Sequence, residues 1–124
     1  AVLAIRNRLV LEAVANALKR AGFFVEKSSS QEPERILTLT NALAATTLVM
    51  DVTRSGDGTF DMRMNTAREA RRRNPEIKIA LLCDNVSDES SAYKVKCAKE
   101  DGSIDAFFYE SVPSDYLADA IDAL

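Results

Sequence analysis

The chain has 124 residues, of which 47% are hydrophobic and 28% charged, and its formal net charge is −3 at pH 7. This length favours one domain, residues 1–124, and the acidic balance argues against nucleic-acid binding by that domain. No apolar run reaches the roughly 18 residues of a membrane-spanning helix and no secretion signal is visible, so we expect a cytoplasmic protein without membrane contact. The absence of His excludes His-based catalytic triads.

The first third of the chain alternates between short apolar runs and helical periodicity. Residues 1–5 predict a strand, and the apolar residues that follow recur at the spacing of a helix of about four turns that ends before Gly22. Residues 23–25 predict a second strand, which ends at Ser28-Ser29-Ser30. Residues 33–43 are open to two interpretations, because Pro33 suits the first turn of a helix whereas the β-branched alternation also fits a strand. We favour the helix because the segment lies between two strands.

The same alternation continues to the end of the chain. Thr59 and Ser87 are both placed to cap a helix, since each hydroxyl precedes a segment of helical character. Further strands are predicted at 46–51, 77–82 and 104–109, and further helices at 60–73, 88–101 and 114–124. The result is a pattern of five strands and five helices in strict alternation.

Strict alternation predicts an α/β fold in which a parallel sheet is covered by helices on both faces. A doubly wound, flavodoxin-like (βα)5 domain with strand order 2-1-3-4-5 fits this pattern best, and its switch point lies between strands 1 and 3. Ligands of such folds bind at the carboxyl ends of the strands. Asp51 ends the third strand, so we expect it to lie beside Arg6 and Asn7, which follow the first.

The whole chain resembles the receiver domain of bacterial response regulators. The resemblance rests on the run Leu48-Val49-Met50-Asp51, the turn Gly56-Asp57-Gly58, the helix end Lys19-Arg20-Ala21-Gly22 and the final Val112-Pro113-Ser114-Asp115-Tyr116-Leu117. It implies two-component, or phosphorelay, signal transduction, in which a sensor histidine kinase phosphorylates Asp51 with Mg²⁺ bound. Phe107 stands at the position of the family's aromatic switch.

Most of the family's other site positions differ in this chain. The acidic pair that holds Mg²⁺ is replaced by Arg6 and Asn7, and the Ser or Thr after the fourth strand is replaced by Cys83. Glu110 stands where the family has a Lys. The sequence therefore resembles an atypical receiver with a degenerate phosphorylation site, in which Asp51 is the phospho-acceptor candidate.

These replacements change the charge of the expected site. Asp51 and Glu110 face Arg6, which gives a local charge of −1 where the family has −2. One carboxylate, the Asn7 amide and the Thr53 carbonyl make a poor shell for Mg²⁺, which prefers carboxylate and water oxygens. We therefore expect no metal or other cofactor, with Mg²⁺ on Asp51 as the remaining alternative. We expect the Arg6 guanidinium to pair with Asp51 or Glu110.

The expected function is that of a receiver-like interaction module without enzymatic activity. Its expected partners are a sensor histidine kinase or another signalling protein, a second copy docked through the 88–101 helix, the 104–109 strand and the 114–124 helix, and an output domain after Leu124. One alternative is a receiver that switches on phosphorylation of Asp51. Another alternative is a flavodoxin-like domain that binds a small ligand. A ligand bound at the Arg6 end of the sheet would favour this alternative.

Overall fold

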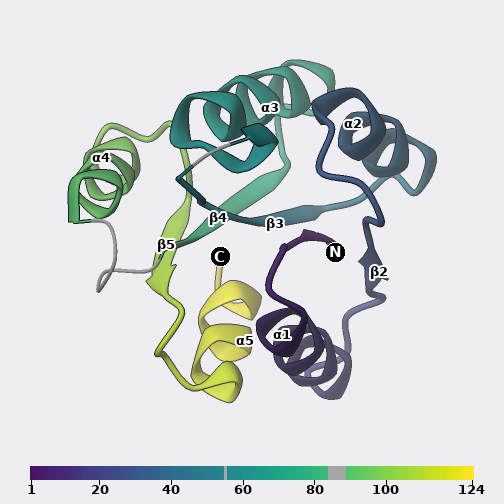
Figure 1. Cartoon of the computed structure of the whole chain (residues 1–124). Coiled ribbons are helices and arrows are strands. Elements are labelled where there is room, and N and C mark those ends of the chain that lie inside the picture. The colour runs from purple at the N-terminus through teal and green to yellow at the C-terminus, as the bar shows by residue number, and fades with distance from the viewer. Residues whose placement is uncertain (55, 84–88) are drawn as a thin grey trace.

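The computed structural model describes residues 1–54, 56–83 and 89–124 (Figure 1). In this part of the chain the strands are β1 (Val2–Ala4), β2 (Glu26–Lys27), β3 (Thr47–Asp51), β4 (Lys78–Cys83) and β5 (Ala106–Tyr109). The helices are α1 (Arg8–Arg20), α2 (Pro33–Ala42), α3 (Phe60–Arg73), α4 (Glu89–Glu100) and α5 (Ser114–Asp122), and a short 3-10 turn, η1 (Gly56–Gly58), precedes α3. The predicted cap Ser87 lies outside the described residues.

The strands form one parallel sheet in the order β2-β1-β3-β4-β5, which confirms the predicted doubly wound fold. Helices α2, α3 and α4 lie on one side of the sheet, and α1 and α5 lie on the other (Figure 1). Among the described helices, none combines the length and the apolar character that crossing a membrane requires.

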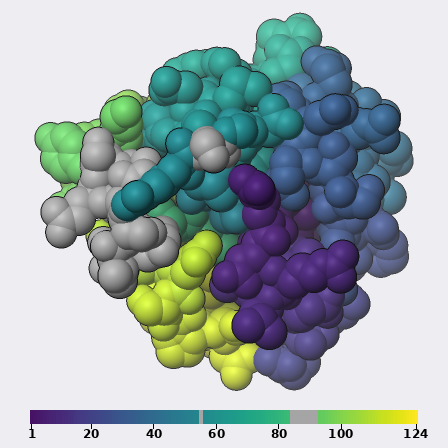
Figure 2. All heavy atoms as spheres, in the orientation of Figure 1, coloured from purple at the N-terminus to yellow at the C-terminus, as the bar shows by residue number. Residues whose placement is uncertain are grey.

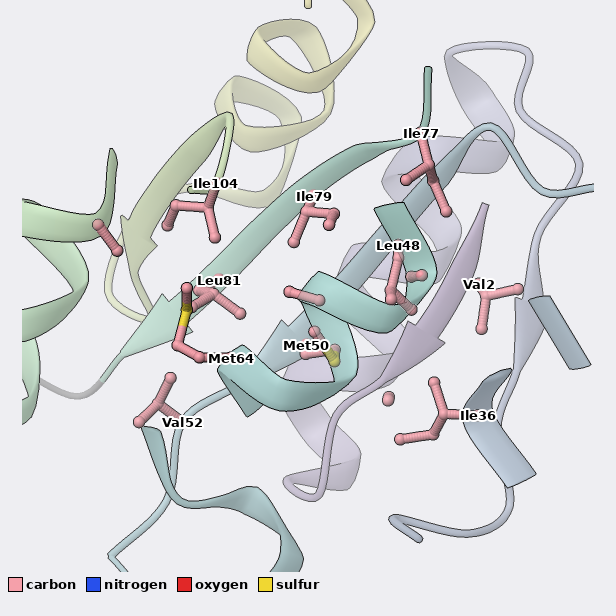
Figure 3. Packing of buried hydrophobic residues seen from close by; sticks show 14 of the residues in the cluster. Val2, Ile36, Leu48, Met50, Val52, Met64, Ile77, Ile79, Leu81 and Ile104 are labelled. Atoms are coloured by element: carbon pink, nitrogen blue, oxygen red, sulfur yellow. The ribbon is translucent and has the colours of Figure 1, made fainter. Parts of the chain in front are cut away.

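Side chains from the two faces of the sheet enter two separate hydrophobic clusters. Leu48 and Met50 of β3 point into the cluster beneath α2, α3 and α4, to which Met64 of α3 also belongs (Figure 3). Val49, between them, belongs to the cluster beneath α1 and α5. This alternation along a fully buried strand explains why β3 reads as an uninterrupted apolar run.

The second strand begins three residues later than predicted, so its predicted start at residue 23 is wrong, whereas its predicted end at Ser28 agrees with the structure. Only Glu26 and Lys27 pair with β1, at Val2 and Leu3. The preceding apolar residues lie outside the ladder, and Phe24 is 72% exposed. Apolar character misled the prediction here because β2 is an edge strand whose paired residues are polar.

Helix α2 settles the ambiguous segment in favour of a helix. Pro33 occupies its first turn, where a missing backbone N–H is no loss. The buried side chains of this helix are Ile36, Leu37 and Thr40, which lie at helical and not at strand spacing. The Thr40 hydroxyl donates to the Ile36 carbonyl at 2.7 Å, which satisfies a buried polar group inside the helix.

Candidate functional site

Asp51 ends β3 at the carboxyl edge of the sheet, and its carboxylate is buried there. The residue is 1% exposed. Its Oδ1 atom accepts a hydrogen bond from Arg63 Nη2 at 2.9 Å, and its Oδ2 atom accepts one from the backbone N–H of Arg6 at 2.9 Å. Both carboxylate oxygens are therefore held by donors from the protein itself.

Arg63, in the first turn of α3, forms the ion pair with Asp51. Its Nε donates to the Asp51 carbonyl oxygen at 2.8 Å, and its Nη2 donates to the carbonyl of Ala4 at 3.1 Å and to Oε1 of Gln31. The side chain is fully buried. One guanidinium thus joins the ends of β1 and β3 with the loop before α2, and it lies at the topological switch point of the fold.

Burial and charge act on Arg63 in opposite directions. Burial lowers the pKa of the guanidinium, and the neighbouring carboxylate of Asp51 acts to raise it. Within the described part of the chain, Nη1 has no hydrogen-bond partner. Arg63 and Asp51 form a buried ion pair. Removal of either side chain would leave the charge of the other buried and uncompensated.

Thr59 and the turn η1 place Arg63 above the strand ends. The Thr59 hydroxyl caps α3 by accepting from the Met62 N–H, and the Thr53 N–H donates to the Gly58 carbonyl at 2.7 Å. A Cβ atom on Gly58 would lie 2.3 Å from Thr53 Oγ1, so only glycine fits this approach. The loop after Asp51 is therefore folded back tightly, and α3 starts close to the carboxyl edge.

Arg6 and Asn7 lie at this edge, but not in the roles expected for their side chains. The Arg6 guanidinium is exposed and makes no ion pair with Asp51 or Glu110, so the predicted pairing of Arg6 is wrong. Its backbone N–H is what reaches Asp51. The Asn7 side chain caps α1 by accepting from the N–H groups of Leu9 and Val10. The ion pair belongs to Arg63 because α3, and not β1, directs its side chain into the switch point.

The remaining predicted residues lie along β4 and β5. Cys83 is buried and its thiol lies 3.8 Å from the Phe108 carbonyl oxygen, in the geometry of a weak hydrogen bond. The Glu110 N–H donates to the Cys83 carbonyl at 3.0 Å, which extends the pairing of these strands by one residue. Phe107 is half-buried and contacts Tyr109 edge to face, with ring centroids 5.8 Å apart.

The donors at this edge do not fit Mg²⁺. No group of three or more Cys, Asp or Glu side chains placed to hold a metal occurs among the residues that the structure describes. Both oxygens of Asp51 are engaged, and the Asn7 amide oxygen is used in capping α1. Arg63 places a positive charge 2.9 Å from the carboxylate that a metal ion would need.

Arg63 was not among the residues singled out from the sequence, although the pattern contained a signal. The inward face of α3 carries Met64, Ala67 and Ala70, all buried, and Arg63 lies on the same face. A charged residue inside an apolar helical face indicates a buried partner. Asp51, the carboxylate expected at the end of the buried strand, is the partner that this pattern indicates.

Neither a protein-family model nor a curated protein sequence matches the chain. Several solved structures match it in fold. The receiver domain of NtrX from Brucella abortus aligns with a TM-score of 0.74 at 16% identity, over 99% of this chain and 96% of that one. A LuxR-family DNA-binding response regulator from Staphylococcus aureus aligns at 0.72 and 15% identity, over 98% and 94%.

A CheY-like receiver domain protein from Methanospirillum hungatei aligns with a TM-score of 0.71 at 16% identity, over 98% of this chain and 90% of that one. At identities this low the similarity concerns the fold. The chain has the fold of a response-regulator receiver domain.

Proposed function

We propose that the chain is a receiver-like domain of two-component signal transduction that acts as a protein-interaction module without phosphorylation of Asp51. The observation that carries this proposal is the state of the Asp51 carboxylate. It is 1% exposed, and its two oxygens accept from Arg63 and from the Arg6 backbone. The receiver fold supports the class of the domain, and the engaged carboxylate supports the proposal that it does not switch by phosphorylation.

Phosphoryl transfer depends on positioning the acceptor oxygen in line with the donor and on neutralising the developing charge. Here the acceptor oxygens point at fixed donors in the interior, so attack would require Arg63 or the Arg6 backbone to move away. Moving Arg63 would break four hydrogen bonds of its guanidinium and leave a buried charge unpaired. The guanidinium supplies permanently the positive charge that a metal ion would supply transiently. We assign no catalytic residue to the domain.

The partners of such a module would be a histidine kinase, another signalling protein, an output domain or a second copy of the chain in the cytoplasm. The elements α4, β5 and α5 suit this role because the two helices carry Tyr93 and Tyr116, which are 69% and 62% exposed. Tyrosine is enriched in protein interfaces. Sedimentation velocity of the wild type and of Tyr93→Ser/Tyr116→Ser would test the homodimer. A concentration-dependent dimer that the double variant abolishes would support this surface.

A phosphorylation assay tests the central claim. The protein is incubated with acetyl phosphate and Mg²⁺, and its intact mass is followed together with that of an active receiver domain in the same mixture. We expect the active receiver to gain a phosphoryl group and this chain to gain none. Because Asp57 is a second acidic residue close to the site, Asp51→Asn and Asp57→Asn serve as matched variants.

A phosphoryl adduct that disappears in Asp51→Asn and persists in Asp57→Asn would overturn the proposal. It would instead establish the alternative, a receiver that switches on Asp51.

A further inference from the structure

A cavity of about 460 Å³ opens between the carboxyl ends of β1 and β2, beside the first turn of α1. It is lined by Arg6 and Arg8 from the end of β1 and the start of α1, and by Lys27 and Ser29 from the end of β2. In Figure 2 the purple N-terminal segment lies on the near face, next to the blue segment that leads into α2. The cavity therefore lies on the edge of the sheet where doubly wound folds bind ligands.

The charges that line this cavity do not cancel. Lys27 is paired with Glu12 at 2.7 Å, so these two contribute no net charge. Arg6 and Arg8 are exposed, and in the described part of the chain neither is paired with a carboxylate. Arg6 and Arg8, two residues that line the cavity, thus each carry a guanidinium group with no carboxylate partner among the described residues, in a protein whose net charge is −3.

Positive side chains near the cavity also act on the Glu12 carboxyl. The hydrogen bond from Lys27 and its charge lower the pKa of Glu12, and the charges of Lys19 and Arg8 lower it further. An anion in the cavity would therefore enter a region that already favours negative charge.

Gln31 connects the cavity to the buried ion pair. Its side chain lines the cavity, and its Oε1 accepts a hydrogen bond from Arg63 Nη2, which also binds Asp51. A ligand that contacts Gln31 would be separated from Asp51 by two side chains, those of Gln31 and Arg63. The cavity is thus adjacent to the site described above and shares the Gln31 side chain with it.

We propose that this cavity binds a small molecule through a dianionic phosphate group held by Arg6 and Arg8. A guanidinium binds phosphate oxygens through two parallel N–H donors, and two unpaired guanidinium groups match the charge of a phosphate monoester. A single carboxylate would leave one of them uncompensated. The Ser29 hydroxyl supplies a further donor at the cavity wall. The site holds its anion with side chains, since the turn after β1 contains no glycine to cradle a phosphate.

Titration by ¹⁵N–¹H NMR tests this proposal with glucose 6-phosphate as the probe and glucose and sodium sulfate as comparisons. We expect saturable shifts of the amides of Arg6, Arg8, Ser29 and Gln31 with glucose 6-phosphate, and none with glucose. The variant Arg6→Gln/Arg8→Gln should weaken binding about tenfold or more, because each lost charge-assisted contact alone is worth about a tenfold change in affinity. Arg68→Gln removes an exposed arginine on α3 and should leave binding unchanged.

Shifts that fail to saturate, equal shifts with sulfate, or unchanged affinity in Arg6→Gln/Arg8→Gln would each overturn the proposal. Both substituted side chains are exposed and the backbone N–H of residue 6 is retained, so the variant should keep its fold. The result does not depend on the phosphorylation assay, because that assay reports on Asp51 and this one on the cavity.

Discussion

Helix α3 carries two arginines that bridge strand ends at opposite edges of the sheet. Arg63 joins the carboxyl ends of β1 and β3 through Ala4 and Asp51. Arg71 lies at the opposite edge, where β4 and β5 begin. It pairs with Asp105 and donates to the carbonyls of Gly102 at 3.0 Å and Ser103 at 3.2 Å. In both clusters the carboxylate also accepts a backbone N–H, at 2.9 Å for Asp51 and 2.8 Å for Asp105.

The two clusters differ in exposure and in position. The Arg63 side chain is 0% exposed, whereas that of Arg71 is 29% exposed, so water can replace part of what Arg71 binds. The Arg71 cluster lies at the edge of the sheet that doubly wound folds do not use for ligands, and it holds the fold together. The Arg63 cluster does the same at the edge where ligands bind. The same kind of arginine–carboxylate cluster therefore occurs at both edges, and it is fully buried only at the carboxyl edge.

The largest effect is expected from Arg63→Met. It leaves the Asp51 carboxylate buried without its cation and should destabilise the protein by about 3–5 kcal/mol. Urea unfolding followed by circular dichroism measures this. The matched control is Arg68→Met on the exposed side of the same helix, which should change stability by less than about 0.5 kcal/mol. Equal effects of the two substitutions would contradict a special role for Arg63.

The next effect is a recovery of stability in a double variant. Adding Asp51→Asn to Arg63→Met removes the buried negative charge and keeps an acceptor for the Arg6 N–H. The double variant should therefore be more stable than Arg63→Met, by about 1–3 kcal/mol, since residues in one ion pair are not additive. A double-mutant cycle of urea midpoints measures the coupling. Simple additivity would mean that the pair does not act as a unit.

A smaller loss is expected from Arg71→Met. Its carboxylate partner is only partly buried and keeps the Ile79 N–H as a donor, so we expect a destabilisation of about 1–2 kcal/mol. The same unfolding measurement applies. A loss as large as that of Arg63→Met would mean that exposure does not distinguish the two clusters.

The smallest effect concerns a third arrangement on α3, at its solvent face. Hydrogen bonds from Arg72 and Arg73 lower the pKa of Glu69 to about 2. Because this pKa lies below the ordinary value of 4.5, the interaction stabilises the helix above about pH 4.5 and is lost as the pH falls towards 2. The side-chain carboxyl shift of Glu69 in an NMR titration measures it. A midpoint near 4.5 would show that these solvent-facing contacts do not persist in solution.

The sequence determined the fold because the information is local. Apolar runs such as 46–51, helical spacing around Leu18, and breakers such as Gly22 fix the order of strands and helices, and strict alternation then implies a parallel sheet. Asp51 could also be placed at the carboxyl edge, since that follows from the end of a strand. The edge strand β2 was predicted to start too early, because its pairing residues carry no apolar pattern.

Only the tertiary structure decided what surrounds Asp51. Arg6 and Arg63 are both near it in the folded chain, but one contributes a backbone N–H and the other a buried guanidinium. Sequence order favoured Arg6, because adjacent strand ends are expected to meet. The direction of the side chains depends on the tight turn after β3 and on the start of α3, which no periodicity specifies. The identity of the acidic residue was therefore readable from the sequence, whereas its ion-pair partner was a property of packing.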